Sequence, residues 1–69
     1  MNKQISWIIA AISEFAKAKS LTDKEAFNYL HFFKGLDFLL LHYEAEHLLS
    51  FDDAVEDATA ICRRNGGLL

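Results

Sequence analysis

The stretch Leu36–Ser50 limits the folds open to this chain more than any other part of it. At about 100° per residue on a helical wheel, its mostly apolar side chains occupy two opposite sides of a helix. One side holds Leu36, Leu39, Leu40, Tyr43 and His47, and the other holds Phe38, Leu41, Ala45, Leu48 and Leu49. A helix that is apolar on two opposed faces is covered on both, by its own domain, by a second chain or by one of each. We therefore expect this stretch to be the central helix, and residues 43–45 are where it would break.

Three further segments repeat apolar residues every three or four positions, which predicts amphipathic helices. With the central stretch they predict an all-α, four-helix domain over residues 1–69, with helices at about 4–19, 23–34, 36–48 and 51–65. The expected buried faces consist of Ile5, Ile8, Ile9, Ile12, Phe15 and Ala16 in the first helix, Ala26, Phe27, Leu30 and Phe33 in the second, and Phe51, Ala54, Val55, Ala58, Ile61 and Cys62 in the last.

Local signals predict where the helices begin and end. Thr22, followed three positions later by Glu25, predicts a capping box at the start of the second helix. Ser50 is expected to be the N-cap of the last helix. Gly35 is expected to adopt the left-handed conformation that often follows a helix end.

The small size of the chain conflicts with its apolar content. A chain of 69 residues buries only about 60% of its extended-chain surface. Yet 52% of these residues are hydrophobic and there is one cysteine, so no internal disulfide can form. We therefore expect part of the apolar surface to be buried between chains, in a homodimer or against a protein partner.

Charge and hydropathy argue against several classes of partner. The net charge is −3 and the basic residues are scattered, whereas a nucleic-acid-binding face needs a basic stripe. There is neither a signal-peptide pattern nor a run of apolar residues long enough to span a membrane. We expect no nucleic-acid or membrane partner, and an intracellular, cytoplasmic location.

Catalytic and metal-binding patterns are weak. His42 and His47 are five positions apart, whereas a helical two-histidine zinc site places its histidines four apart. His42 and Glu46 have that spacing, so a small metal-binding protein that uses His42, Glu46 and His47 is a minor alternative. No nucleophile elbow or glycine-rich phosphate loop is present. We therefore expect a protein that is not an enzyme, with no catalytic residue, cofactor or metal.

Tyr43 and His47 share one helix face, one turn apart. They are either a packing pair or part of a recognition patch. The acidic residues from Glu44 to Asp57 are either a solvated face or a complement to a basic partner. Trp7 is expected at the half-buried edge of the core, and would be an interface anchor if exposed.

The order of the motifs resembles DUF3791, a short bacterial family of unknown function, over about residues 5–64. The motifs are Leu-Thr-x-x-Glu-Ala-Phe, Gly-Leu-Asp-Phe-Leu, Tyr43-Glu44-x-x-His47 and Phe-Asp-Asp-Ala-Val-x-Asp. The family usually has leucine where this chain has Glu46. The resemblance implies a gene that neighbours one for an ADP-ribosyltransferase-like protein, as in toxin–antitoxin or toxin–immunity pairs. It also marks Tyr43, Glu44 and His47 as the motif, with Asp37 and Asp53 beside it.

The leading hypothesis is a non-enzymatic helical protein–protein interaction module, the antitoxin or immunity partner of an ADP-ribosyltransferase-like toxin. The residues expected to bind the partner are Trp7, Phe38, Leu41, Tyr43, Glu44, His47 and Leu48. The alternative is a homo-oligomeric structural protein without a toxin partner, whose third helix packs at a two-fold axis.

Overall fold

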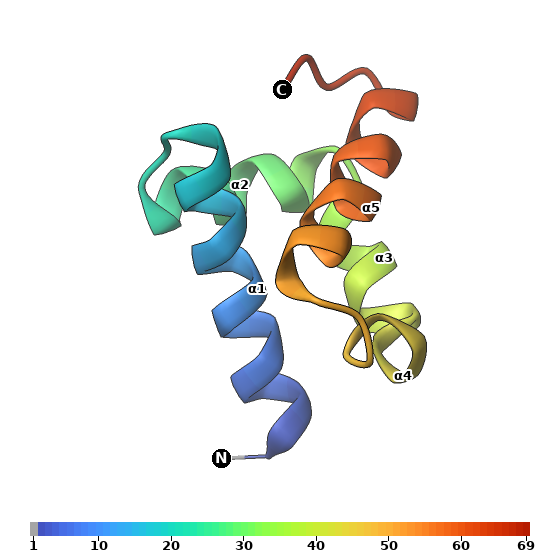
Figure 1. The fold of residues 1–69 in the computed structure, drawn as a ribbon. Coiled ribbons are helices and arrows are strands. Elements are labelled where there is room, and N and C mark those ends of the chain that lie inside the picture. The colour runs from blue at the N-terminus through green and yellow to red at the C-terminus, as the bar shows by residue number, and fades with distance from the viewer. Residues whose placement is uncertain (1) are drawn as a thin grey trace.

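Five α-helices follow one another in residues 2–69, the part of the chain that the computed structural model describes (Figure 1). They are α1 (Lys3–Lys19), α2 (Asp23–Phe32), α3 (Gly35–Leu41), α4 (Tyr43–Glu46) and α5 (Phe51–Arg64). The all-α class is confirmed. The count of four helices is wrong, because the predicted central helix is divided into α3 and α4. Met1, which the predicted domain included, lies outside the described residues.

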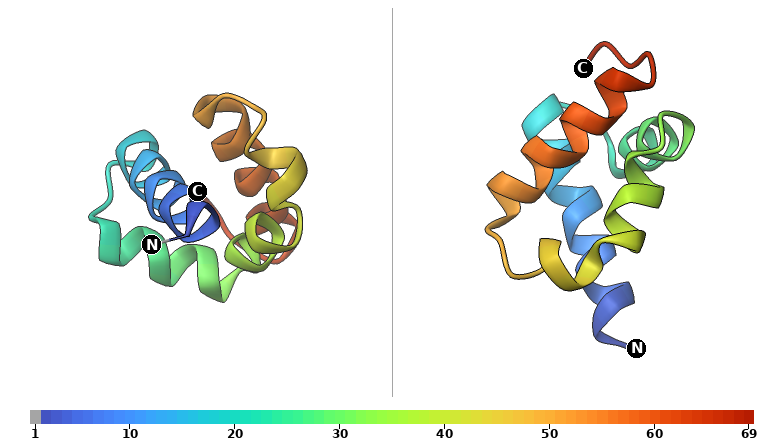
Figure 2. Two further views of the ribbon diagram at one scale, coloured as in Figure 1. Left: turned by 90° about the horizontal axis from the view of Figure 1, so that it is seen from below. Right: turned by 90° about the vertical axis from the view of Figure 1, so that its right-hand side faces the viewer.

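Four of the helices close a ring around the core. α1 packs against α2 and α5, and α3 packs against the same two helices. The short α4 is joined to this ring mainly through α3. Figures 1 and 2 show α4 at the same end of the molecule as the N-terminal turns of α1, with the C-terminus at the opposite end. Within residues 2–69, no helix combines the length and hydrophobicity needed to cross a bilayer.

All four helices of the ring contribute apolar side chains to the core. Its largest fully buried side chains are those of Phe15, Leu30, Leu39 and Cys62, one from each helix of the ring. Smaller or slightly more accessible core residues are Ile8, Ala11, Ile12, Ala16, Ala26, Leu36, Ala54 and Ala58. Burying one large apolar side chain stabilises a fold by roughly 1.5–3 kcal/mol, so this cluster is the main source of stability.

Two predicted buried faces are rotated from where the sequence put them. Ile9 and Phe27 were expected in the core, but they are 51% and 44% exposed, and Ile5 is also exposed. The buried residues of α1 are Ile8, Ala11, Ile12, Phe15 and Ala16, and those of α2 are Ala26 and Leu30. Ala11 was not among the predicted core residues, so the buried face of α1 is turned away from Ile5 and Ile9 towards Ala11.

The predicted capping signals are confirmed. The amide of Thr22 donates to Glu25 Oε1 (2.9 Å), and the amide of Glu25 donates to Thr22 Oγ1 (3.1 Å). At the start of α5, Ser50 Oγ accepts from the amide of Asp53 (3.1 Å). Each N-cap typically contributes about 1 kcal/mol, and these local bonds determine where α2 and α5 begin.

The prediction for Gly35 is wrong. The left-handed residue is Lys34, with φ of 72°, and Gly35 is instead the buried first residue of α3. A Cβ on Gly35 would lie 2.6 Å from Cys62 Sγ and 2.8 Å from Leu30 Cδ2. A side chain at residue 35 would therefore force Cys62 or Leu30 to move, because α3 packs closely against α5 and α2 at this point.

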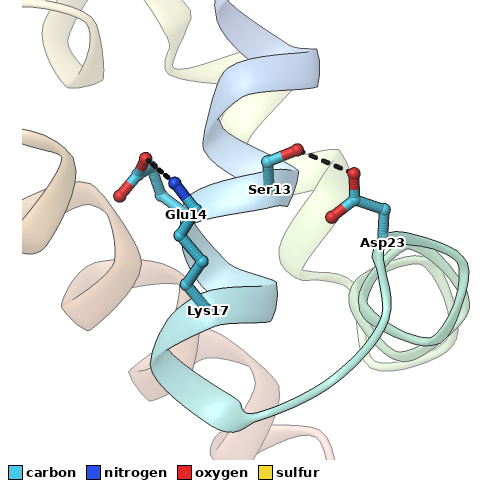
Figure 3. Close-up of polar contacts among 4 residues, drawn as sticks. All are labelled: Ser13, Glu14, Lys17 and Asp23. Carbon is cyan, nitrogen blue, oxygen red and sulfur yellow. Dashed lines mark hydrogen bonds and ion pairs between the residues drawn. The ribbon is translucent and has the colours of Figure 1, made fainter.

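Polar contacts outside the core support the α1–α2 turn. Figure 3 shows Ser13 Oγ donating to Asp23 Oδ2 across 2.9 Å, which ties α1 to the first residue of α2. The same view shows Lys17 Nζ 3.5 Å from Glu14 Oε2, one turn apart on α1. Both side chains of this pair are more than one-third exposed, and such surface ion pairs contribute little to stability.

Candidate functional site

The predicted central helix bends at His42. This residue has φ of −104° and ψ of 24°, so α3 ends at Leu41 and α4 begins at Tyr43. The carbonyl of His42 accepts hydrogen bonds from the amides of Ala45 and Glu46, at 3.1 and 2.9 Å. The break lies one residue before the predicted 43–45, and the helix ends at Glu46 rather than at 48. The bend turns α4 away from the direction of α3, and it exposes the leucines on either side.

The bend carries exposed leucine side chains. Leu41 is 80% exposed and Leu48 is 77% exposed, and Leu40 and Leu49 are also accessible. Leu40 and Leu41 line an open hollow of about 370 Å³ together with Gln4, His42, Tyr43, Glu44 and Ala45. We call these seven residues, together with the exposed Leu48 that follows α4 in the chain, the bend surface. Single exposed apolar residues are common on proteins, but adjacent ones beside a hollow are typical of binding sites.

Gln4 and Leu40 are part of this surface although the sequence analysis did not assign them to it. Gln4 Nε2 donates to the carbonyl of Leu40 across 3.4 Å, which links the first turn of α1 to the end of α3. These residues are 36 positions apart, so no local pattern could have brought them together.

Aromatic side chains link α4, next to the bend, to α1 and α5. Trp7 meets Tyr43 edge-to-face, with ring centroids 5.6 Å apart, and stacks on Phe51 at 6.2 Å. Trp7 is half-buried, as predicted for a residue at the edge of the core. Aromatic pairs contribute about 0.5–1.5 kcal/mol beyond burial, so this contact fixes α4 against α1 and α5.

Tyr43 and His47 form a packing pair. Their rings are stacked with centroids 4.5 Å apart and planes at 13°, and His47 Nδ1 lies 2.8 Å from the carbonyl oxygen of Tyr43. A carbonyl can only accept, so Nδ1 is the donor of this hydrogen bond. This geometry matches the packing-pair interpretation of the two residues. His47 is exposed, but it is not among the residues that line the hollow.

The remaining predicted partner-binding residues are placed differently. Glu44 is exposed on the bend surface, whereas Phe38 is half-buried and packs on the core, with its ring 5.0 Å from that of His42. The structure therefore brings Leu41, Tyr43 and Glu44 together around one hollow. It places Trp7 and Phe38 beneath that surface rather than on it.

Glu46 is the residue whose environment departs furthest from expectation. It is only 6% exposed, and its Oε1 is buried without a hydrogen-bond donor from residues 2–69. Burial, followed by the interaction with the Asp57 carboxyl and the negative charge of Asp53, raises the pKa of Glu46 from 4.5 to about 7. The sequence signal for burial at this position was the leucine that the resembling family usually has here.

The alternative metal site does not form. His47 Nδ1 faces a backbone carbonyl, His42 lies against Phe38, and Glu46 turns towards α5. Across the described part of the chain, no group of three or more histidine, cysteine, aspartate or glutamate side chains could hold a metal ion. The proposed ligands His42, Glu46 and His47 thus have different neighbours and do not converge on one point.

Comparison with known proteins bears out the resemblance. The sequence profile of a family described as "Protein of unknown function (DUF3791)" matches residues 6–65. No curated protein and no solved structure matches the chain. The matched region spans all of α2 to α5 and most of α1, so it includes all of the bend surface except Gln4.

Proposed function

We propose that this chain, which belongs to the DUF3791 family of proteins of unknown function, is a non-enzymatic module that binds another protein through the bend surface. The observation that carries the proposal is the exposure of Leu41 and Leu48 on either side of α4. Large apolar side chains next to a hollow favour a partner that can insert an apolar group. A cytoplasmic location is part of the proposal.

The partner in this proposal is an ADP-ribosyltransferase-like toxin encoded next to this gene, as the family resemblance implies. The chain would act as its antitoxin or immunity protein by covering part of the toxin surface. The charge of the bend surface supports a partner with basic residues around the contact, because Glu44 is exposed there and the whole chain has a net charge of −3. Such complementarity speeds association and selects the partner.

Co-expression with the neighbouring gene product, followed by affinity capture and calorimetry, tests this function. Replacing Leu41 or Leu48 by aspartate should weaken the complex by about tenfold or more, since removing a central apolar contact typically costs over 1 kcal/mol. Leu68→Asp is the matched control, because Leu68 is 93% exposed but lies in the C-terminal tail. Separate elution of the two proteins at micromolar concentration, or equal effects of all three substitutions, would refute the proposal.

Self-association is the second candidate, and the same exposed leucines favour it. A homodimer would bury the bend surface of one copy against that of another. Light scattering coupled to size exclusion separates the candidates. A wild-type dimer that Leu41→Asp converts to monomer supports self-association, whereas a wild-type monomer at high concentration removes it.

A further inference from the structure

The end of the molecule opposite the bend carries a second exposed apolar surface. Figure 1 shows the C-terminus at the end opposite α4. Phe32, the last residue of α2, is 75% exposed, and Leu68 is 93% exposed. The ring of Phe32 meets that of Phe33 edge-to-face, with centroids 4.9 Å apart. The Phe33 ring in turn lies 3.9 Å from where a Cβ on Gly66 would be, so the end of α2 and the C-terminal tail lie side by side.

Hydrogen bonds hold the C-terminal tail against α2 and α5. The amide of Leu69 donates to the hydroxyl of Tyr29 across 3.1 Å, and Arg63 Nε donates to the carbonyl oxygen of Leu69 across 3.0 Å. Gly67, two positions earlier, is buried. Leu68 lies between these two fixed residues, so the contacts of its neighbours keep its side chain in the solvent.

This end of the molecule is basic. Arg63 and Arg64 are exposed in the last turn of α5. The ion pair found within residues 2–69 joins Lys17 to Glu14, so neither arginine has an acidic partner in the described part of the chain. The exposed apolar and basic side chains here, which we call the tail surface, are Phe32, Arg63, Arg64 and Leu68.

The bend end of the molecule has the opposite charge. Glu44 is exposed on the bend surface, and Asp52 is exposed in the first turn of α5. Trp7 contacts both Tyr43 of α4 and Phe51 of α5, so this acidic first turn lies next to α4. Exposed leucines and unpaired acids therefore share one end of the molecule, and exposed apolar groups and unpaired arginines share the other.

The opposite charges of the two ends do not neutralise each other within one chain. Asp52 and Arg63 are three turns apart on α5, which is roughly 16 Å along the helix axis. Salt screens exposed charges beyond about 8 Å. The two ends become close only when different molecules meet. Two bend surfaces in contact would place acids opposite acids, whereas a bend surface on a tail surface places acids opposite arginines.

We propose that the bend surface of one copy of this protein docks on the tail surface of a second copy, so that the molecules associate head to tail. Leu41 and Leu48 of the first copy meet Phe32 and Leu68 of the second, with the unpaired charges around them. Each pair of molecules keeps one unused bend surface and one unused tail surface. Such a contact therefore continues into a ring or an open chain.

The size of the contact makes it weak. The two smaller dimensions of the molecule are 22 and 18 Å, so an end face offers about 400 Å² on each copy, which is below the range of stable interfaces. Association is therefore reversible and needs high protein concentration. Because the bend surface is also the proposed partner site, a bound partner protein would prevent head-to-tail growth at that end; this consequence rests on the proposed function.

Mixing two variants tests the contact without any partner. Leu41→Asp blocks the bend surface and Phe32→Asp blocks the tail surface. In sedimentation from about 10 µM to about 1 mM, the wild type should exceed the mass of a dimer, and each variant alone should associate about tenfold more weakly or less. Their equimolar mixture should stop at a dimer, because one intact bend surface and one intact tail surface remain. A monomeric wild type, or Phe32→Asp that associates like the wild type, would overturn the proposal.

Charge reversal provides a second test should Phe32→Asp fail to fold. Arg64→Glu leaves the apolar side chains in place and should weaken association at least about threefold. Lys3→Glu is the matched control, because it changes the net charge equally but replaces an exposed lysine in the first turn of α1. It should leave association intact. Equal weakening by both substitutions would mean that net charge, rather than the tail surface, controls association, and the proposal would be wrong.

Self-association is measured on the chain alone, so this proposal and the proposed function fail independently. A chain that binds the neighbouring gene product but stays monomeric refutes the head-to-tail contact alone. A chain that self-associates as the mixing experiment requires, but binds no neighbouring gene product, refutes the proposed function alone.

Discussion

The imidazole of His47 lies flat on the ring of Tyr43, and its Nδ1 lies 2.8 Å from the carbonyl oxygen of Tyr43. His47 thus contacts both the ring and the backbone carbonyl of Tyr43. This double contact closes the four-residue helix α4. It gives the Tyr-Glu-x-x-His motif a structural role, because the spacing of four is what places the ring over the first residue of the helix.

Removing the imidazole should destabilise the protein. We expect His47→Ala to lower the free energy of unfolding by about 1–2 kcal/mol, from one hydrogen bond and one aromatic contact. Urea denaturation followed by circular dichroism measures the change. His31→Ala is the control, since His31 also stacks on an aromatic ring, that of Phe27, but at 6.0 Å. Equal effects of the two substitutions would contradict a special role for the Tyr43–His47 pair.

The raised pKa of Glu46 predicts how stability depends on pH. The pKa is about 7 in the folded protein and 4.5 for an ordinary glutamate, so between these values the folded state binds more protons than the unfolded state. The contribution of Glu46 is therefore fully present below pH 4.5, falls as the pH rises to 7, and is constant above. At about 1.4 kcal/mol per pKa unit, the total change is up to about 3 kcal/mol.

Urea unfolding of the wild type and of Glu46→Gln at several pH values tests this dependence. Subtracting the Glu46→Gln profile from the wild-type profile removes the contributions of the histidines and the other acids. The remaining difference should favour the variant above pH 7 and vanish or reverse at pH 4.5. The Glu56→Gln profile should run parallel to the wild type. A Glu46→Gln profile parallel to the wild type would show that Glu46 ionises normally.

The contact between Gly35 and Cys62 predicts a coupled pair of substitutions. Gly35→Ala places a Cβ 2.6 Å from Cys62 Sγ, and overpacking of this kind costs about 1–3 kcal/mol. Cys62→Ala removes the sulfur, so Gly35→Ala should cost less in that background, although Leu30 Cδ2 still lies within 2.8 Å. A double-mutant cycle measured by thermal unfolding should give a favourable coupling of about 1 kcal/mol. Additive costs would mean that the sulfur is not the obstacle.

The leucines of the third predicted helix should separate into two classes. Leu41→Asp should change the free energy of unfolding by less than about 0.5 kcal/mol, because Leu41 is 80% exposed. Leu39→Ala should cost about 2–5 kcal/mol, because Leu39 is 2% exposed in the core. Chemical denaturation of both variants checks this contrast. A large loss of stability in Leu41→Asp would place Leu41 in the core and remove it from the proposed binding surface.

Sequence reasoning succeeded where the physics is local. The starts of α2 and α5 were predicted correctly because Thr22 and Ser50 each bond an amide three residues away. Trp7 was expected at the edge of the core and lies there. The stretch Leu36–Ser50 was expected to be apolar on two faces, and its Leu41 and Leu48 are exposed.

The candidate site was predictable only in part. Leu41, Tyr43 and Glu44 were named from the sequence, and they line one hollow. Gln4 lines the same hollow, but it lies in α1, 36 positions before Leu40, to which its side chain donates a hydrogen bond. Phe38 was named too, and it packs against the core instead. Helical periodicity shows which residues share a face, but not which face a neighbouring helix will cover.

The sequence by itself determined the all-α class and the starts of α2 and α5, because caps and periodicity depend on residues within one or two turns of each other. Only the tertiary structure decided that α3 and α4 part at His42, that Lys34 rather than Gly35 is left-handed, and that Glu46 is buried beside Asp57. Each of these depends on where a second helix lies, and that position follows from the packing of the whole core.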